Sequence, residues 1–334
     1  MGLKIRQIII KKNISDINFL YGKKIACDMS NILYQFLTAI RSNNGDFLKN
    51  DNDQIISHLY GLFFRVCFFI RNGALPVFIF DGNPPLFKLK TLNNRMNQKK
   101  KSEYLMKISL LNGNYKDYIK YFKRCSYITD EIIYSSKTLL RNMGIPFIQS
   151  PSEGEAQASY MEMSKDVDYV LSQDYDTMLF GAENIIHNIK NISNKKLPCS
   201  YELLSLSSNL KSLGITREQL IELCICIGTD FNDGFPRVGC KTALKLIKKY
   251  SSLKNIYYSK YSNLDIDIEH LYNVKNFFLN PPILRNYNYR FIKPKYDKLI
   301  SFLCDENNFD RNTVLKYCKQ YQSNIEKYFE SIFH

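Results

Sequence analysis

Four short apolar runs, each ending in a polar residue, constrain the fold of this 334-residue chain more than any other feature. They cover residues 24–28, 76–81, 145–149 and 169–174, and segments long enough to form helices separate them. Parallel strands that are covered on both faces have this continuous apolar character. The pattern therefore predicts an α/β fold with a mostly parallel sheet, and we expect the functional groups at the carboxyl ends of its strands.

The charge of the chain favours a polyanionic partner. Lys and Arg number 46 against 32 Asp and Glu, which leaves a formal net charge of +14. Eleven of these cations lie in residues 86–127, where only Glu103 and Asp117 oppose them. Aromatic residues are interleaved with the cations and offer stacking surfaces beside phosphate-binding groups. We predict a substrate-facing insertion that binds nucleic acid; the alternative is a solvated helical face.

The cysteines and the apolar segments exclude several other classes of protein. The nine cysteines are scattered and none has C-x-x-C spacing, which disfavours a disulfide framework and a zinc site. The most apolar run, residues 60–70, is interrupted by Arg65 and is too short to span a bilayer. Residues 1–12 lack a secretory signal. We expect an intracellular protein in a reducing compartment, with no membrane partner.

Seven acidic residues stand out because they follow the apolar runs or begin the next segment: Asp28, Asp81, Glu153, Glu155, Asp174, Asp176 and Asp230. None of the four histidines lies among them, which disfavours imidazole chemistry. Clustered carboxylates are suited to Mg²⁺ or Mn²⁺, and such sites often hold two ions about 4 Å apart for attack on a phosphodiester. If the chain stays extended beyond residue 174, the side chains of Asp174 and Asp176 share one face.

Two of these segments also have a simpler interpretation. Ser152 and Glu155 have the spacing of a capping box, in which Glu155 only closes the start of a helix. Asp81 precedes Gly82 and a Pro-Pro pair, which is typical of a turn. Each interpretation explains one segment alone, whereas a metal site explains all of them together.

The motifs occur in the order and at the separations found in the flap endonucleases of the 5′-nuclease superfamily, and the chain resembles that family over its whole length. The matching motifs are IACDMSNILYQFL, PVFIFDGNPP, MGIPFIQSPSEGEAQAS, SQDYDTMLFG and LCICIGTDFNDGFPRVGCKTALKLIKKY, together with the run from Lys88 to Arg95. The resemblance implies a PIN-like nuclease core, a helical arch and a helix-two-turn-helix module that binds DNA.

The resemblance also divides the chain into regions. It implies an N-terminal nuclease region over residues 1–105, with the arch insertion at about 86–127. An internal nuclease region follows over residues 128–255 and contains the helix-two-turn-helix at about 214–250. A C-terminal helical region covers residues 256–319, and residues 320–334 form a tail.

Matched motif by motif, the resemblance assigns roles to individual residues. One Mg²⁺ ion would be held by Asp28, Asp81, Glu153 and Glu155, and a second by Asp174, Asp176 and Asp230 with Glu155 shared; Mn²⁺ would substitute. Lys88 and Arg95 match the catalytic cations that contact the scissile phosphate. The implied DNA-binding residues are Gly2, Tyr34, Arg41, Arg65, Lys88, Arg95, Glu153, Gly228, Asp230, Gly239 and Lys241.

Two positions depart from the pattern of the family. Gln173 stands where relatives often have an acid, although no ligand is lost. Arg237 replaces the first glycine of the hairpin formed by residues 234–241, whereas Gly239 is kept and allows backbone amides to approach a phosphate. The family often binds K⁺ at this hairpin through backbone carbonyls, and the resemblance implies such an ion here.

The activity implied is a structure-specific 5′ flap endonuclease with 5′ to 3′ exonuclease activity, which acts in replication (Okazaki fragment maturation) and base excision repair in the nucleus. Two alternatives remain. Residues 174–179 also resemble the D-x-D-x-T motif of haloacid dehalogenase phosphatases, but that interpretation gives no role to the other carboxylates. A non-catalytic DNA-binding scaffold would explain the basic insertion but not the clustered acids, which repel DNA when no metal is bound.

Residues 322–329 carry the pattern of a sliding-clamp box. Gln322 is followed by Ile325 and by the adjacent aromatics Tyr328 and Phe329. Residues three apart eclipse in a turn of 3₁₀ helix, so these apolar side chains would form one plug for a pocket. We predict a trimeric sliding clamp (PCNA) as partner. The alternative is a final amphipathic helix packed on the core, because the same residues also suit a period of 3.6.

Overall fold

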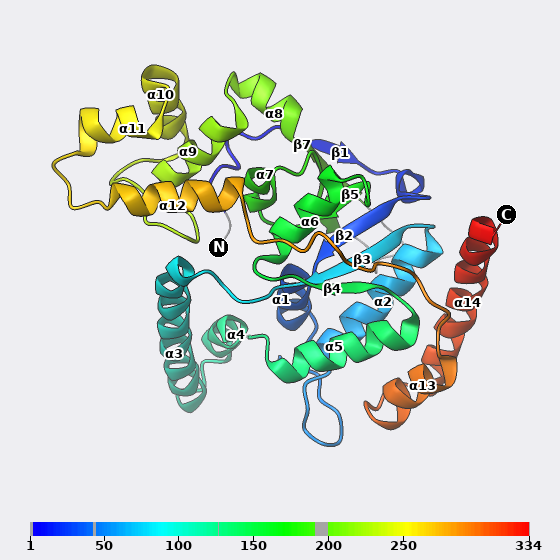
Figure 1. The fold of residues 1–334 in the computed structure, drawn as a ribbon. Helices are drawn as coiled ribbons and strands as arrows, with labels where there is room; N and C mark the ends of the chain where they lie inside the picture. Colours follow the sequence, from blue (N-terminus) through cyan, green and yellow to red (C-terminus); the bar gives the residue numbers. More distant parts are fainter. Residues whose placement is uncertain (1–2, 43–44, 126, 191–199, 334) are drawn as a thin grey trace.

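A seven-stranded sheet lies at the centre of the computed structural model, which describes residues 3–42, 45–125, 127–190 and 200–333 (Figure 1). The strand order is β1-β7-β6-β5-β2-β3-β4. Strands β2 to β6 run parallel, and the edge pair of β1 and β7 is antiparallel. The predicted mostly parallel α/β sheet is therefore confirmed. The strands are β1 Lys12–Ile14, β2 Lys24–Asp28, β3 Leu75–Phe80, β4 Phe147–Gln149, β5 Tyr169–Leu171, β6 Asn184–Lys190 and β7 Ser200–Ser205.

Helices cover both faces of the sheet, which explains why its strands are apolar throughout. On β2, Ala26 packs into one core, whereas Ile25 and Cys27 pack into the other, as the alternation of strand side chains requires. The first core is completed by α6 Gly154–Met163, α7 Asp176–Phe180, α8 Leu206–Leu213, α9 Arg217–Ile227, α10 Cys240–Tyr250, α11 Leu253–Ile256 and α12 Ile268–Leu279. The second is completed by α1 Met29–Ala39, α2 Ser57–Arg71, α5 Asp130–Met143, α13 Tyr296–Ile300 and α14 Arg311–Phe333. Short helical turns η1 Ile17–Leu20, η2 Leu86–Lys88, η3 Tyr257–Tyr261 and η4 Ser301–Asp305 connect these elements.

The arch segment is helical, and it is anchored to the first core only at its start, where Phe87 packs against Phe231 and Phe277. It consists of η2, α3 Leu89–Leu111 and α4 Tyr115–Arg124, and in Figure 1 α3 and α4 project from the lower left of the molecule. Only Ser102 and Ser109 are buried along α3. A helix that buries so little of itself presents most of its side chains to the surroundings, as the substrate-facing insertion requires.

The predicted helix-two-turn-helix corresponds to α9, the loop of residues 228–239 and α10. Thr216 and Gln219 form a reciprocal capping box that starts α9. Gly228 and Arg237 both have positive φ, 103° and 61° respectively. The left-handed conformation of Arg237 explains why glycine would suit this position, because it costs a residue with a Cβ atom about 1 kcal/mol or more.

The chain turns earlier after β5 than the sequence predicts. The strand ends at Leu171, and the hydroxyl of Ser172 accepts a hydrogen bond from the backbone N–H of Asp174 at 3.1 Å. This local turn competes with strand pairing, and Asp176 already begins α7. The chain is therefore not extended at Asp174 and Asp176, and the condition under which both would share one strand face is not met.

The C-terminal box lies in a continuous α-helix rather than in a turn of 3₁₀ helix. Helix α14 extends to Phe333, and Ile325 is fully buried in the second core. On the same helix, the Tyr321 hydroxyl donates to the carbonyl of Met143 at 2.6 Å. The expected 3₁₀ conformation is wrong, because period-3.6 packing of α14 buries Ile325 on the core. The side chains of Tyr328 and Phe329, and all of Gly2, lie outside the described residues.

Candidate active site

The carboxyl ends of β2 and β3 place two carboxylates beside the start of α6. Asp28 is 3% exposed, begins α1 as its N-cap, and accepts from the backbone N–H of Ser30 at 3.1 Å. Asp81 follows β3 and accepts from the backbone N–H of Gly154 at 2.6 Å. A Cβ atom on Gly154 would lie 2.8 Å from Oδ1 of Asp81, so only glycine allows this approach without a shift. The Ser30 hydroxyl donates to the other oxygen of Asp81 and links the two strand ends.

Helix α6 supplies two further carboxylates. Glu153 is its N-cap residue and makes no side-chain cap hydrogen bond. Glu155 accepts hydrogen bonds from the hydroxyls of Ser172 and Thr177 instead of closing the helix start. The capping-box interpretation of Ser152 and Glu155 is therefore wrong, because Ser152 precedes the N-cap position and Glu155 faces the end of β5.

The turn after β5 contributes Asp174 and Asp176. Asp176 is 8% exposed, and its Oδ1 atom has no hydrogen-bond partner among the described residues. A buried carboxylate oxygen without a donor is costly, which makes a cation the natural partner for this atom.

Burial and mutual repulsion disfavour the charged form of this carboxylate cluster. Burial, followed by the charge of Asp81, raises the pKa of Asp28 to about 8. Burial and then Asp174 raise the pKa of Asp176 to about 8. Burial and then Asp28 raise the pKa of Glu155 well above its usual value. Several desolvated carboxylates at one site are the arrangement that a divalent cation would neutralise.

Cations from the arch pair with the rim of the cluster. Lys88 donates to Glu153 at 2.6 Å, and both side chains are largely buried, at 13% and 14% exposure. Burial alone would lower the pKa of Lys88, but Glu153, Asp81 and Asp230 together outweigh burial, and the pKa rises. Arg95 donates to Asp230 at 2.6 Å, with side chains 40% and 21% exposed. Two cations and two carboxylates with predicted roles therefore meet across the base of the arch.

The cluster has the donor set of a magnesium or manganese site. Among the described residues, no three carboxylate, thiol or imidazole groups converge closely enough to enclose an ion in this conformation. The donors nevertheless fit: they are all oxygen atoms, Oδ1 of Asp176 lacks a partner, and Lys88 and Arg95 already provide positive charge at the rim. The assignment of individual carboxylates to ions stays a prediction.

The predicted DNA contacts outside the carboxylate cluster occupy different environments. Tyr34 on α1 is 49% exposed and is free to stack on a base. The guanidinium of Arg41 lies 3.9 Å from the ring centroid of Phe47 and 4.7 Å from that of Phe122 on α4. Gly239 is the N-cap of α10, with nothing within 4 Å of the place where a Cβ atom would stand, and Lys241 is exposed.

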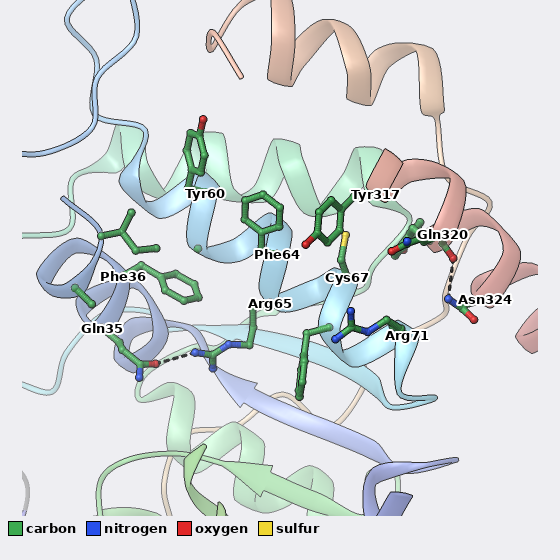
Figure 2. A pocket seen from close by; sticks show the side chains of 15 residues that line it. Gln35, Phe36, Tyr60, Phe64, Arg65, Cys67, Arg71, Tyr317, Gln320 and Asn324 are labelled. Atoms are coloured by element: carbon green, nitrogen blue, oxygen red, sulfur yellow. Dashed lines mark hydrogen bonds between the residues drawn. The ribbon is translucent and has the colours of Figure 1, made fainter. Parts of the chain in front are cut away.

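Arg65 lies in a different setting from the other predicted DNA contacts. It is 8% exposed, donates to Gln35 at 3.2 Å, and lines a pocket of about 480 Å³. Figure 2 shows this pocket between α1, α2 and α14, with Arg65 pointing toward Gln35 and with Tyr317 on the opposite wall. Contact between Arg65 and DNA stays a prediction, and it requires neighbouring side chains to move.

Small polar residues of the site were missed at the sequence level. Ser172 and Asn31 contact the carboxylates directly, as does Thr177. The available signal was position, since Asn31 lies three residues after Asp28 and Ser172 lies two before Asp174. Such residues are common beside acids in loops, so the sequence alone did not single them out.

The sheet, the carboxylates at its carboxyl edge and the arch above them define the class of an XPG-type nuclease. Models of that family match two parts of the chain, the XPG N-terminal domain over residues 1–102 and the XPG I-region over residues 144–230. The solved flap endonuclease-1 from Methanococcus jannaschii superimposes with a TM-score of 0.77 at 35% identity, covering 98% of this chain and 99% of that one. The catalytic core of Rad2 in complex with DNA substrate superimposes with a TM-score of 0.73 at 24% identity, covering 96% and 100%, and shows the fold.

Sequence relatives specify the family within that class. Flap endonuclease 1 of Archaeoglobus fulgidus is 40% identical over 98% of this chain and 100% of its own length. Flap endonuclease 1 of Pyrococcus horikoshii is 41% identical over 94% and 92%. The chain belongs to the flap endonuclease family, and it is a structure-specific nuclease. This assignment excludes the phosphatase and the non-catalytic scaffold. Within the described residues no helix is long and apolar enough to cross a membrane.

Proposed function

We propose that this protein cuts the 5′ flaps of branched DNA by two-metal hydrolysis, with an associated 5′ to 3′ exonuclease activity. The observation that carries the proposal is the buried carboxylate cluster at the carboxyl ends of β2, β3 and β5, with two arch cations at its rim. In a flap endonuclease this arrangement supports hydrolysis of a phosphodiester rather than binding alone.

The residues divide between two Mg²⁺ ions, for which Mn²⁺ would substitute. Asp28, Asp81, Glu153 and Glu155 would hold one, and Asp174, Asp176 and Asp230 the other, with Glu155 shared. When bound, the ions supply an activated water and stabilise the leaving oxygen. Lys88 and Arg95 would then leave Glu153 and Asp230 to the metals and donate to the scissile phosphate, where their charge favours the transition state.

Several surfaces would hold the branched substrate. The exposed Tyr34 offers a stacking platform for the base beside the cleavage point. The start of α10 presents backbone N–H groups at Gly239, with Lys241 beside them, to a duplex phosphate. The positive φ of Arg237 is compatible with a tight loop there, and the family resemblance supports K⁺ binding at that loop.

The biological setting is proposed from the family resemblance. It comprises Okazaki fragment maturation in replication, base excision repair, and the nucleus as the compartment. The trimeric sliding clamp is the proposed partner through Gln322, Ile325, Tyr328 and Phe329. Because Ile325 is buried in the core here, clamp binding through this box requires the end of α14 to leave the core.

A cleavage assay on matched substrates tests the activity. We expect a 5′-labelled flap to be cut near its junction in Mg²⁺ but not in EDTA, and blunt duplex to be cut more slowly from its 5′ end. Asp176→Asn should bind the flap in Ca²⁺ like the unmodified protein while cleavage falls about 10³-fold or more. Metal-independent cleavage, or full cleavage by Asp176→Asn, would overturn the two-metal assignment.

A further inference from the structure

The hydroxyl of Ser172 makes three hydrogen bonds, all with residues in or beside the carboxylate cluster. It donates to Oε1 of Glu155, accepts from the backbone N–H of Asp174 at 3.1 Å, and accepts from the side-chain amide of Asn31 at 3.2 Å. A serine hydroxyl has one hydrogen to donate and two lone pairs to accept with. Every hydrogen-bonding position of Ser172 is therefore occupied, and the residue is 1% exposed.

Asn31 extends this contact to a further strand end. Its amide nitrogen donates to Oδ2 of Asp28 and lies 3.5 Å from Oε1 of Glu155. Asn31 stands on α1, Ser172 follows β5, and Glu155 stands on α6. Two uncharged side chains thus connect the junction of β2 and α1, the turn after β5 and the first turn of α6, which carry Asp28, Asp174 and Glu155 respectively.

We propose that Ser172, with Asn31, is a positioning residue that fixes the relative places of Asp28, Glu155 and Asp174 so that they can bind divalent metal. The inference rests on the proposed metal-dependent function. Carboxylates of like charge repel one another when no ion is present, so an uncharged donor and acceptor between them holds their spacing without occupying the metal's place. Hydrogen bonds that orient ligands in this way commonly contribute 10- to 100-fold to metal affinity.

Metal binding without DNA is the primary test. Mn²⁺ binding is measured by calorimetry on the full chain, comparing Ser172→Ala, Ser172→Thr and Ser159→Ala with the unmodified protein. Ser159 is a matched control because it is also buried beside the site, but its hydroxyl donates to the backbone carbonyls of Glu155 and Thr177 rather than to a carboxylate. We expect Ser172→Ala to weaken Mn²⁺ binding about 10-fold or more. Ser172→Thr, which keeps the hydroxyl, and Ser159→Ala should stay near the unmodified value.

A second measurement separates positioning from general stability. In Ser172→Ala the Mg²⁺ concentration for half-maximal flap cleavage should rise by a similar factor, whereas flap affinity in Ca²⁺-free EDTA buffer should not change. Asn31→Ala should weaken Mn²⁺ binding as well. In the double variant, the loss of binding free energy for Mn²⁺ should be smaller than the sum of the losses in the two single variants, because both residues act through one network.

The outcomes distinguish this inference from the proposed function. If the unmodified protein neither binds Mn²⁺ nor cuts flaps, the proposed function fails. If it does both and Ser172→Ala binds Mn²⁺ equally well, the inference alone is overturned. Loss of thermal stability in Ser172→Ala with unchanged Mn²⁺ affinity, or failure of Ser172→Thr to restore the affinity, also overturns it.

Discussion

Nη2 of Arg95 lies 2.6 Å from Oδ2 of Asp230, which joins the arch to the loop that precedes α10. The two residues are 135 positions apart in the chain. Asp230 is a predicted ligand of the second metal. When no metal is bound, Arg95 therefore occupies a carboxylate that the ion would otherwise bind. Arch position and metal occupancy are therefore connected through one carboxylate.

Replacing Arg95 by Ala should have opposite effects on binding and on cleavage. Without DNA, Mn²⁺ affinity should rise, because a competing cation is removed from Asp230. The single-turnover rate of flap cleavage should fall about 10²- to 10³-fold, because a charge directed at the scissile phosphate is lost. Calorimetry and rapid-quench kinetics measure the two quantities.

Lys90 provides the matched control for Arg95. Its ion pair with Asp233 spans 2.5 Å, but both side chains are highly exposed, at 74% and 81%. Exposed pairs of this kind contribute little, so Lys90→Ala should keep both Mn²⁺ affinity and the cleavage rate near their original values. An unchanged cleavage rate in Arg95→Ala would contradict the role of Arg95.

The salt dependence of flap binding should reveal which arch lysines contact phosphate. Lys100 and Lys101 are exposed, whereas the ammonium of Lys99 lies 3.1 Å from the ring centroid of Tyr127. Replacing Lys100 and Lys101 together by Ala should reduce the slope of log affinity against log salt by up to about 2, whereas Lys99→Ala should change it less. Equal slopes for all variants would show that the arch is a solvated face.

The stability of the metal-free protein should fall as pH rises. Burial raises the pKa of Asp28 and that of Asp176 to about 8 each, from the usual 3.8 of an aspartic acid. At pH values between the unfolded and the folded pKa, the folded state binds more protons than the unfolded state. The free energy of unfolding therefore decreases as pH rises through this interval. Mg²⁺ requires deprotonated carboxylates, and its stabilising effect should grow over the same interval.

Thermal unfolding in EDTA and in Mg²⁺, at about pH 6 and about pH 9, measures this dependence. The melting temperature in EDTA should be lower at the higher pH, and the increase caused by Mg²⁺ should be larger there. Asp176→Asn should reduce both differences, since one titrating carboxyl is removed. A Mg²⁺ effect of equal size at both pH values would contradict the expectation.

The C-terminal box can be tested by separating its buried residue from its aromatic pair. Ile325→Ala should lower the free energy of unfolding by about 2–5 kcal/mol, because Ile325 is fully buried. Replacing Tyr328 and Phe329 together by Ala should leave stability unchanged and abolish clamp stimulation of cleavage. If that pair variant unfolds as easily as Ile325→Ala and still binds the clamp, α14 is only a core helix.

The sequence by itself determined the sheet and the kind of residue at its edge. Continuous apolar runs predicted buried parallel strands, because a strand covered on both faces needs apolar side chains on each. The acid that ends β2 and the acid that follows β3 are predicted to meet, because parallel strands end at one edge of the sheet. Both inferences depend on local composition and on a general rule of topology, which a sequence carries directly.

Only the tertiary structure decided how the carboxylates are held. Asn31 and Ser172 are 141 positions apart, and their hydrogen bond leaves no periodic signal in the chain. The same is true of Arg95 and Asp230, whose pairing depends on where the arch stands over the sheet. Helix α14 shows a second limit of the sequence. Ile325 fits both a clamp box and an amphipathic helix, and the structure buries it on the core as part of that helix, whereas clamp binding stays a prediction. Packing decides which distant polar residues pair and whether a segment follows the period of a 3₁₀ turn or of an α-helix. The free energy behind both choices comes from contacts between residues that only the fold brings together.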